Sequence, residues 1–123
     1  MPNQKVISVV DDDESVRESL PDLLRQFGFA AEAFSSAEEF LAFDRIGKTA
    51  VLILDVALPG MSGPELHREL VRRHKSVPVV FITAHETESA RLRAMTQPDV
   101  QVLFKPFGDM ALLGAINTAL KSA

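Results

Sequence analysis

Cysteine is absent from this 123-residue chain, as is tyrosine. The lack of cysteine excludes disulfide bonds, thiolate catalysis and cysteine-based zinc sites, and it fits a reducing compartment. Long hydrophobic runs are missing as well. The first apolar run, Val6–Val10, is too short for the core of a signal peptide or for a membrane span. We therefore expect a cytoplasmic protein that does not enter a membrane.

An excess of basic residues is also missing, because the formal net charge is −4. Phosphate backbones are bound mainly through clustered Lys and Arg, so this charge argues against direct nucleic acid binding by this domain. Hydrophobic residues make up 46% of the chain, which is enough for an ordinary buried core. The length fits one compact domain, and we expect residues 1–123 to form it.

Short apolar runs alternate with longer amphipathic segments, which is typical of a parallel sheet covered by helices. The runs predict five strands, at residues 6–10, 30–34, 50–54, 79–82 and 100–104. The other segments predict five helices, at residues 14–27, 36–45, 62–74, 88–95 and 109–121. This pattern predicts an α/β fold with a single doubly wound, five-stranded parallel sheet. Pro21 lies inside the first helix, where a proline costs about 3 kcal/mol, so we expect a kink or a later helix start.

Polar side chains follow four of the predicted strands, at the end where such sheets bind ligands. They are Asp11, Asp12 and Asp13 after the first strand, Asp55 after the third, Thr83 at the end of the fourth and Lys105 after the fifth. Each is ordinary alone, because acidic runs are usually solvated loops or helix caps and a single Asp is usually a turn residue. The fold, however, would bring all four positions to one rim.

Clustered carboxylates repel one another unless a cation lies among them. Mg²⁺ suits such a site, since it takes one or two carboxylates and completes its shell with waters and phosphoryl oxygens. A carboxylate beside the metal can attack phosphorus and form an aspartyl phosphate. A nearby Lys can neutralise the phosphoryl oxygens, and a Thr hydroxyl can donate a hydrogen bond to one of them.

These residues stand in motifs that resemble the receiver domains of two-component response regulators. The motifs are Val9-Val10-Asp11-Asp12-Asp13, Leu54-Asp55, Leu58-Pro59-Gly60-Met61-Ser62-Gly63, Ile82-Thr83-Ala84 and Phe104-Lys105-Pro106-Phe107. The resemblance covers essentially the whole chain and implies a flavodoxin-like sheet with strand order 2-1-3-4-5. Two further stretches, 15–20 and 37–41, are similar to receivers that precede LuxR-type helix-turn-helix output domains.

The resemblance also implies a role for each residue of the rim. Asp55 would be the phosphoacceptor, and the Lys105–Pro106 bond would be cis. Mg²⁺ would be bound by Asp11, Asp12, Asp55 and the backbone carbonyl of Ala57. The phosphoryl group and the switch would involve Thr83, Ala84, Lys105 and Val102. The run of three aspartates leaves open a slip of one residue, to Asp12 and Asp13.

A sensor histidine kinase is the partner that the resemblance implies, with homodimer formation on phosphorylation as a further expectation. The domain would catalyse only its own phosphorylation and dephosphorylation. Ala57 and His85 would flank the path of the hydrolytic water, and His85 is the one able to orient it. Val102 departs from the family, because a Tyr or Phe usually stands three residues before the Lys. Val102 and Phe104 could instead form an apolar partner-binding patch between the fourth and fifth helices, or simply pack under them.

Three other functions fit less well. A haloacid-dehalogenase type of phosphoaspartate enzyme needs a second acid two residues after the nucleophile, where this chain has Ala57. A nucleotide or flavin site would need a phosphate-binding loop after the first strand, but that loop is acidic and lacks glycine. A pseudo-receiver, acting as an interaction module without phosphorylation, usually lacks an Asp or the Lys, and this chain keeps them all.

Overall fold

The computed structural model describes residues 4–43, 46–75, 77–84 and 100–122. These residues form a five-stranded parallel sheet with the order β2-β1-β3-β4-β5. The strands are β1 (Val6–Val10), β2 (Ala30–Phe34), β3 (Thr49–Asp55), β4 (Val79–Thr83) and β5 (Gln101–Phe104). The predicted α/β class, the parallel sheet and the strand order implied by the resemblance are confirmed.

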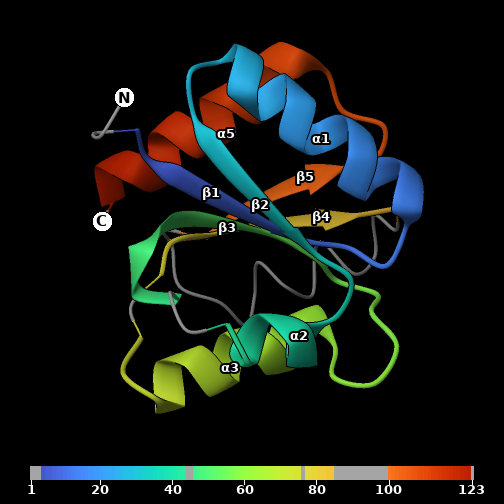
Figure 1. Cartoon of the computed structure of the whole chain (residues 1–123), viewed down its shortest axis with the longest axis vertical. Coiled ribbons are helices and arrows are strands. Elements are labelled where there is room, and N and C mark those ends of the chain that lie inside the picture. Colours follow the sequence, from blue (N-terminus) through green and yellow to red (C-terminus); the bar gives the residue numbers. More distant parts are fainter. Residues whose placement is uncertain (1–3, 44–45, 76, 85–99, 123) are drawn as a thin grey trace.

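Helices cover both faces of the sheet, with α1 and α5 on one side and α2 and α3 on the other (Figure 1). Their bounds are α1 (Glu14–Gln26), α2 (Ala37–Leu41), α3 (Gly63–Arg72) and α5 (Asp109–Ser122), with a 3-10 turn at Ile46–Lys48. The predicted helix at 88–95 lies outside the described residues. No helix within the described part of the chain is both long and apolar enough to cross a membrane.

Helix α1 begins at Glu14, as predicted, and runs through Pro21, so the alternative of a later start is wrong and the kink stays a prediction. The prolyl ring is buried together with Leu20 and Leu24, and this burial offsets the hydrogen bond that proline cannot make. Helix α2 ends at Leu41 instead of continuing to residue 45, and the amide of Phe43 closes a tighter turn on the carbonyl of Phe40 at 3.0 Å.

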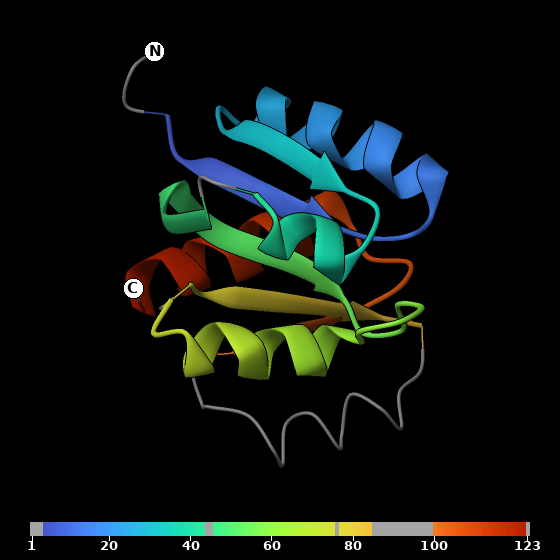
Figure 2. The same cartoon turned by 60° about the horizontal axis from the view of Figure 1, so that its bottom comes forward.

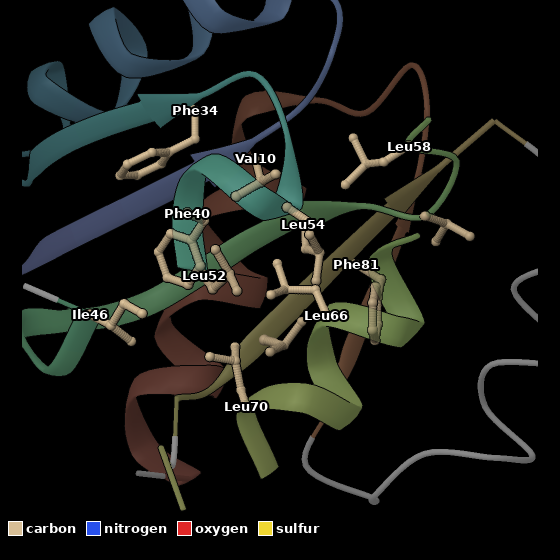
Figure 3. Close-up of a cluster of buried hydrophobic side chains, with 13 residues drawn as sticks. Val10, Phe34, Phe40, Ile46, Leu52, Leu54, Leu58, Leu66, Leu70 and Phe81 are labelled. Atoms are coloured by element: carbon tan, nitrogen blue, oxygen red, sulfur yellow. The ribbon is translucent and has the colours of Figure 1, made fainter. Parts of the chain in front are cut away.

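The strand pattern divides the core between the two faces, because successive side chains of a strand point to opposite sides. Ile53 lies in the cluster beneath α1 and α5, whereas its neighbours Leu52 and Leu54 lie in the opposite cluster. Figure 3 shows the opposite cluster, where Leu66 from α3 and Phe40 from α2 meet the sheet. Figure 2 gives the same layers from a second direction. The buried core thus fixes β1 and β3 side by side at the centre of the sheet.

Strand β5 forms one edge of the sheet and pairs with β4 alone. Val102 and Phe104 are both half-buried on this strand, and Val102 packs against the core cluster on the α2 and α3 side. The apolar patch predicted from these two residues also involves the segment 88–95, which lies outside the described residues. The partner-binding patch therefore stays a prediction.

Candidate functional site

The register of the sheet brings the predicted polar residues to one rim. Val10 at the end of β1 pairs with Leu54 of β3, so Asp11 and Asp55 follow side by side. Asp55 in turn pairs with Ile82 of β4, which places Thr83 one residue beyond it. Thr83 pairs with Phe104 of β5, so Lys105 follows at the same end. Parallel pairing alone therefore gathers side chains that are far apart in the sequence.

Three carboxylates meet at this rim. Oxygens of Asp11, Asp12 and Asp55 all lie within 4.8 Å of one another. Asp11 and Asp55 are buried and Asp12 is exposed, so the cluster is built into the protein on one side and open to water on the other. Such a set fits Mg²⁺, a hard cation that binds carboxylate oxygens and keeps several waters.

Asp13 takes a different place from its two neighbours. Its side chain caps α1 by accepting a hydrogen bond from the amide of Ser15 at 2.9 Å. Its own amide donates to Oδ1 of Asp11, also at 2.9 Å. Within the described residues, the acidic cluster therefore contains Asp11 and Asp12 but not Asp13. This arrangement favours the first of the two alignments that the run of aspartates leaves open.

Lys105 supplies the positive charge of the cluster. Its Nζ lies 3.1 Å from Oδ2 of Asp11 and 3.4 Å from Oδ2 of Asp55. Partial burial of the ammonium acts to lower the pKa of Lys105, but the hydrogen bond that it donates to Asp11 and the charges of both carboxylates outweigh burial and raise the pKa. The ammonium is therefore charged at neutral pH and bridges the two buried carboxylates.

Asp55 lies in an environment that is unfavourable for a charged carboxylate. Burial, followed by repulsion from Asp11, raises the pKa of Asp55 from 3.8 to about 6. The charge of Lys105 and a 3.3 Å hydrogen bond from the amide of Ala57 act in the opposite direction without cancelling the increase. One lysine is thus insufficient compensation for two adjacent carboxylates, as expected of a site suited to a further cation.

The remaining predicted site residues lie in or next to strands β3, β4 and β5. Thr83 is buried, and its carbonyl accepts a 2.8 Å hydrogen bond from the amide of Lys105. Ala84 and Ala57 are exposed at the rim. The Lys105–Pro106 bond is cis, as expected. Val102 is not at the rim, because it pairs with Phe81 two residues before the strand end, and His85 lies outside the described residues.

The loop between β3 and α3 is held close to Asp55. The amide of Gly63 donates to the carbonyl of Val56 at 3.1 Å, and a methyl group on Gly63 would overlap the carbonyl oxygen of Asp55. Ser62 caps α3 and shares a reciprocal pair of hydrogen bonds with Glu65, so the predicted helix start is confirmed. Glycine at position 63 therefore lets the helix begin directly against the site.

Two contacting residues have no role in the motif-based prediction. A guanidinium nitrogen of Arg17 donates to the carbonyl of Asp11 at 3.1 Å. The carboxylate of Glu38 accepts a hydrogen bond from the amide of Met61 at 3.1 Å and links α2 to the loop after Asp55. Both residues lie in the two stretches that resemble receivers preceding LuxR-type output domains, but that resemblance does not identify the group that each side chain contacts.

The comparisons agree with this site. The model of the response regulator receiver domain matches residues 7–117. Nodulation protein W of Bradyrhizobium diazoefficiens is 42% identical over 114 residues, covering 93% of this chain and 50% of that protein. Transcriptional regulatory protein FixJ of Rhizobium meliloti is 39% identical, covering 92% of this chain and 55% of that protein. The structure of response regulator StyR aligns with a TM-score of 0.86 and 44% identity, over 95% of this chain and 59% of StyR.

The chain spans about half the length of the curated relatives it matches. The matched part runs from residue 7 in β1 to residue 117 in α5, so it includes four described strands in full, β1 from Ile7 on, and the acidic rim. The fold, the site and the family match therefore describe the same domain. The chain belongs to the response regulator receiver domain family.

Proposed function

We propose that the chain accepts a phosphoryl group on Asp55 from a sensor histidine kinase, in a reaction that requires Mg²⁺. The observation that carries this proposal is the meeting of Asp11, Asp12 and Asp55 within 4.8 Å, with the Lys105 ammonium 3.4 Å from Asp55. A buried carboxylate with this much negative charge around it is poorly solvated. A bound metal would therefore stabilise it, and the metal and the lysine would both stabilise the acyl phosphate that it forms.

The metal would be held by the carboxylates of Asp11, Asp12 and Asp55 and by the backbone carbonyl of Ala57. When bound, it would neutralise the charge of the carboxylates and of the phosphoryl oxygens. The nucleophile belongs to the chain itself. A carboxylate oxygen of Asp55 forms a bond to phosphorus while the phosphorus–nitrogen bond of the kinase's phosphohistidine breaks. The imidazole leaves and takes up a proton.

Lys105 and Thr83 would bind the transferred group. The ammonium already donates to Oδ2 of Asp55 at 3.4 Å, so it is placed to donate to a phosphoryl oxygen on that carboxylate. Thr83 lies on the neighbouring strand, where its hydroxyl could reach a second oxygen after a small movement of the 83–84 segment, and the backbone of Ala84 would move with it. Val102 on the adjacent strand β5 would then adjust to this movement. In this way phosphorylation of Asp55 would change the outer surface of the domain.

The state of Asp55 would act through a partner or an attached domain. The relative FixJ is named a transcriptional regulatory protein, and the chain matches about half of it. This supports a regulator whose second half carries the output, with phosphorylation-dependent self-association as one route to that output. The domain's own net charge of −4 favours protein contacts over nucleic acid contacts.

The proposal is tested by intact mass measurement after incubation with acetyl phosphate and Mg²⁺. We expect the mass of one phosphoryl group to be gained, and we expect none when a chelator replaces Mg²⁺. Hydroxylamine, which cleaves acyl phosphates, should remove the added group. A folded protein whose mass stays unchanged with donor and Mg²⁺ would overturn the proposal and favour a phosphorylation-independent interaction module.

The identity of the metal ligands gives a second expected result. Asp12→Asn should weaken Mg²⁺ binding by about ten-fold or more, because a charged oxygen ligand is lost. Asp13→Asn should change it less than about three-fold, because Asn keeps the capping oxygen of α1 and Asp13 lies outside the cluster. Titration of backbone amide shifts with Mg²⁺ compares the two. A larger loss for Asp13→Asn would mean that the alignment of the acidic turn is off by one residue.

A further inference from the structure

The acidic turn 11–13 is held at its two ends but not at its centre. Asp11 is buried, its amide donates to the carbonyl of Phe34 at 3.1 Å, and both of its carboxylate oxygens accept hydrogen bonds. Asp13 is fixed as the cap of α1. Asp12 is exposed, and within the described part of the chain its carboxylate has no hydrogen bond or ion pair. The direction of Asp12 therefore depends on the backbone that carries it.

The side chain of Arg17 holds the backbone on the Asp11 side of Asp12. One guanidinium nitrogen donates to the carbonyl of Asp11 at 3.1 Å. That carbonyl belongs to the peptide group that joins Asp11 to Asp12, so fixing it fixes the plane from which Asp12 projects. The amide of Arg17 donates to the carbonyl of Asp13, also at 3.1 Å, but this is the first backbone hydrogen bond of α1 and does not depend on the side chain at position 17. The guanidinium thus adds, at the Asp11 end of the turn, a contact that the helix alone does not provide.

We propose that Arg17 is a positioning residue for the metal site, which holds the Asp11–Asp12 peptide so that Asp12 stands within reach of Asp11 and Asp55. The proposal rests on the Mg²⁺-dependent function proposed above. Arg17 does not touch the metal or the phosphoryl group. It acts through the orientation of Asp12, the one carboxylate of the cluster that the described side chains leave unsupported.

Because Arg17 is positively charged, a positioning role and a purely electrostatic role predict opposite changes in Mg²⁺ affinity when it is replaced. A guanidinium near the site repels a divalent cation, so removing it would tighten Mg²⁺ binding if charge were all that mattered. Removing a residue that orients a ligand weakens metal binding, commonly by ten-fold or more. The two roles therefore predict opposite changes for the same substitution.

The experiment compares Arg17→Met with Arg25→Met. Arg25 is a second arginine of α1, and it also donates to a backbone carbonyl, that of Ala31 at 3.2 Å, but on β2 away from the cluster. Both variants lose one positive charge and one hydrogen bond to a backbone carbonyl, and Arg25→Met also loses the exposed ion pair with Asp22, which is worth little. We expect Arg17→Met to weaken Mg²⁺ binding about ten-fold, and Arg25→Met to change it less than about two-fold.

Binding is measured from amide shifts during Mg²⁺ titration, since the chain has neither Trp nor Tyr for fluorescence. Far-UV circular dichroism shows whether each variant is folded, and Arg17→Leu, which also has no hydrogen-bond donor in its side chain, replaces Arg17→Met if that variant is not. Unchanged or tighter binding in a folded Arg17 variant overturns the positioning role while leaving the proposed function intact. Failure of the wild-type protein to bind Mg²⁺ at all would instead contradict the proposed function.

Discussion

Asp55→Asn is expected to abolish phosphorylation of the chain completely and, in the absence of Mg²⁺, to stabilise its fold at neutral pH. The first effect follows from the loss of the nucleophilic carboxylate. The second follows from burial, because the wild-type Asp55 must ionise in a buried position beside Asp11, whereas Asn remains neutral. A functional carboxylate that is buried at a cost to stability is expected to show both effects when it is replaced, a loss of activity and a gain of stability.

The pH dependence of this stabilisation has a definite sign. The pKa of Asp55 is raised from 3.8 to about 6 in the fold, so the folded state holds the proton more tightly than the unfolded chain does. The contribution of protonated Asp55 is fully present below about pH 4 and is lost as pH rises through about 6. We expect the advantage of Asp55→Asn to grow over this range to about 1–2 kcal/mol, less than the full shift implies because water reaches the rim.

Urea denaturation of wild type and variant with chelator, at pH 4 and pH 7.5, measures this difference. Asp22→Asn is the matched control, because Asp22 is an exposed aspartate whose pairing with Arg25 at 3.2 Å is worth little. Its effect should stay within about 0.5 kcal/mol at both pH values. Added Mg²⁺ should stabilise the wild-type protein more than Asp55→Asn. Equal stability of wild type and Asp55→Asn at both pH values would contradict the raised pKa.

The strands, and the meeting of the polar residues at one rim, could be predicted from the sequence because one physical rule governs both. A parallel sheet covered on both faces needs apolar runs, and β1 and β2 have the bounds that their runs predict. Parallel strands end at the same edge, so polar residues that follow them meet there. Asp11, Asp55 and Lys105 needed no further information to be placed together. The strand order itself came from the family resemblance, which the pairing confirms.

Contacts across loops were not predictable in the same way. Arg17 and Glu38 reach backbone groups whose position depends on loop geometry, and periodicity carries no information on that geometry. The sequence could not decide whether Pro21 delays the start of α1, because it gives the local cost of an interior proline but not the burial that offsets this cost. The division of the three aspartates into two cluster members and one helix cap also required the fold.

Gly63→Ala is expected to disrupt the site more than any other single methyl group added to a glycine in the described part of the chain. A methyl group there would overlap the carbonyl oxygen of Asp55 and lie 3.0 Å from the Cα of Val56. Both are backbone atoms, so neither can rotate away as a side chain would. Either α3 must move outward or the end of β3 must shift, and in both cases the Asp55 carboxylate is displaced from Asp11 and Lys105.

We expect Gly63→Ala to destabilise the fold by about 1–3 kcal/mol, the usual cost of overpacking. Phosphorylation by acetyl phosphate should slow by about a hundred-fold, since a displacement near 1 Å is enough for such a loss. Gly114→Ala is the control, because a methyl group on Gly114 in α5 would meet nothing within 4 Å and should stabilise the helix by about 0.5–1 kcal/mol. Urea denaturation and the rate of mass gain provide the two readouts.

Gly60→Ala separates crowding of the site from strain in the loop. Gly60 has φ of +74°, which alanine adopts at a cost, but the atom nearest to an added methyl group belongs to the flexible side chain of Glu38. Gly60→Ala should therefore lower stability and leave the Asp55 carbonyl in place, so the folded fraction should be phosphorylated at nearly the wild-type rate. If Gly60→Ala and Gly63→Ala slow phosphorylation equally, the close approach of α3 to Asp55 is not what positions the carboxylate.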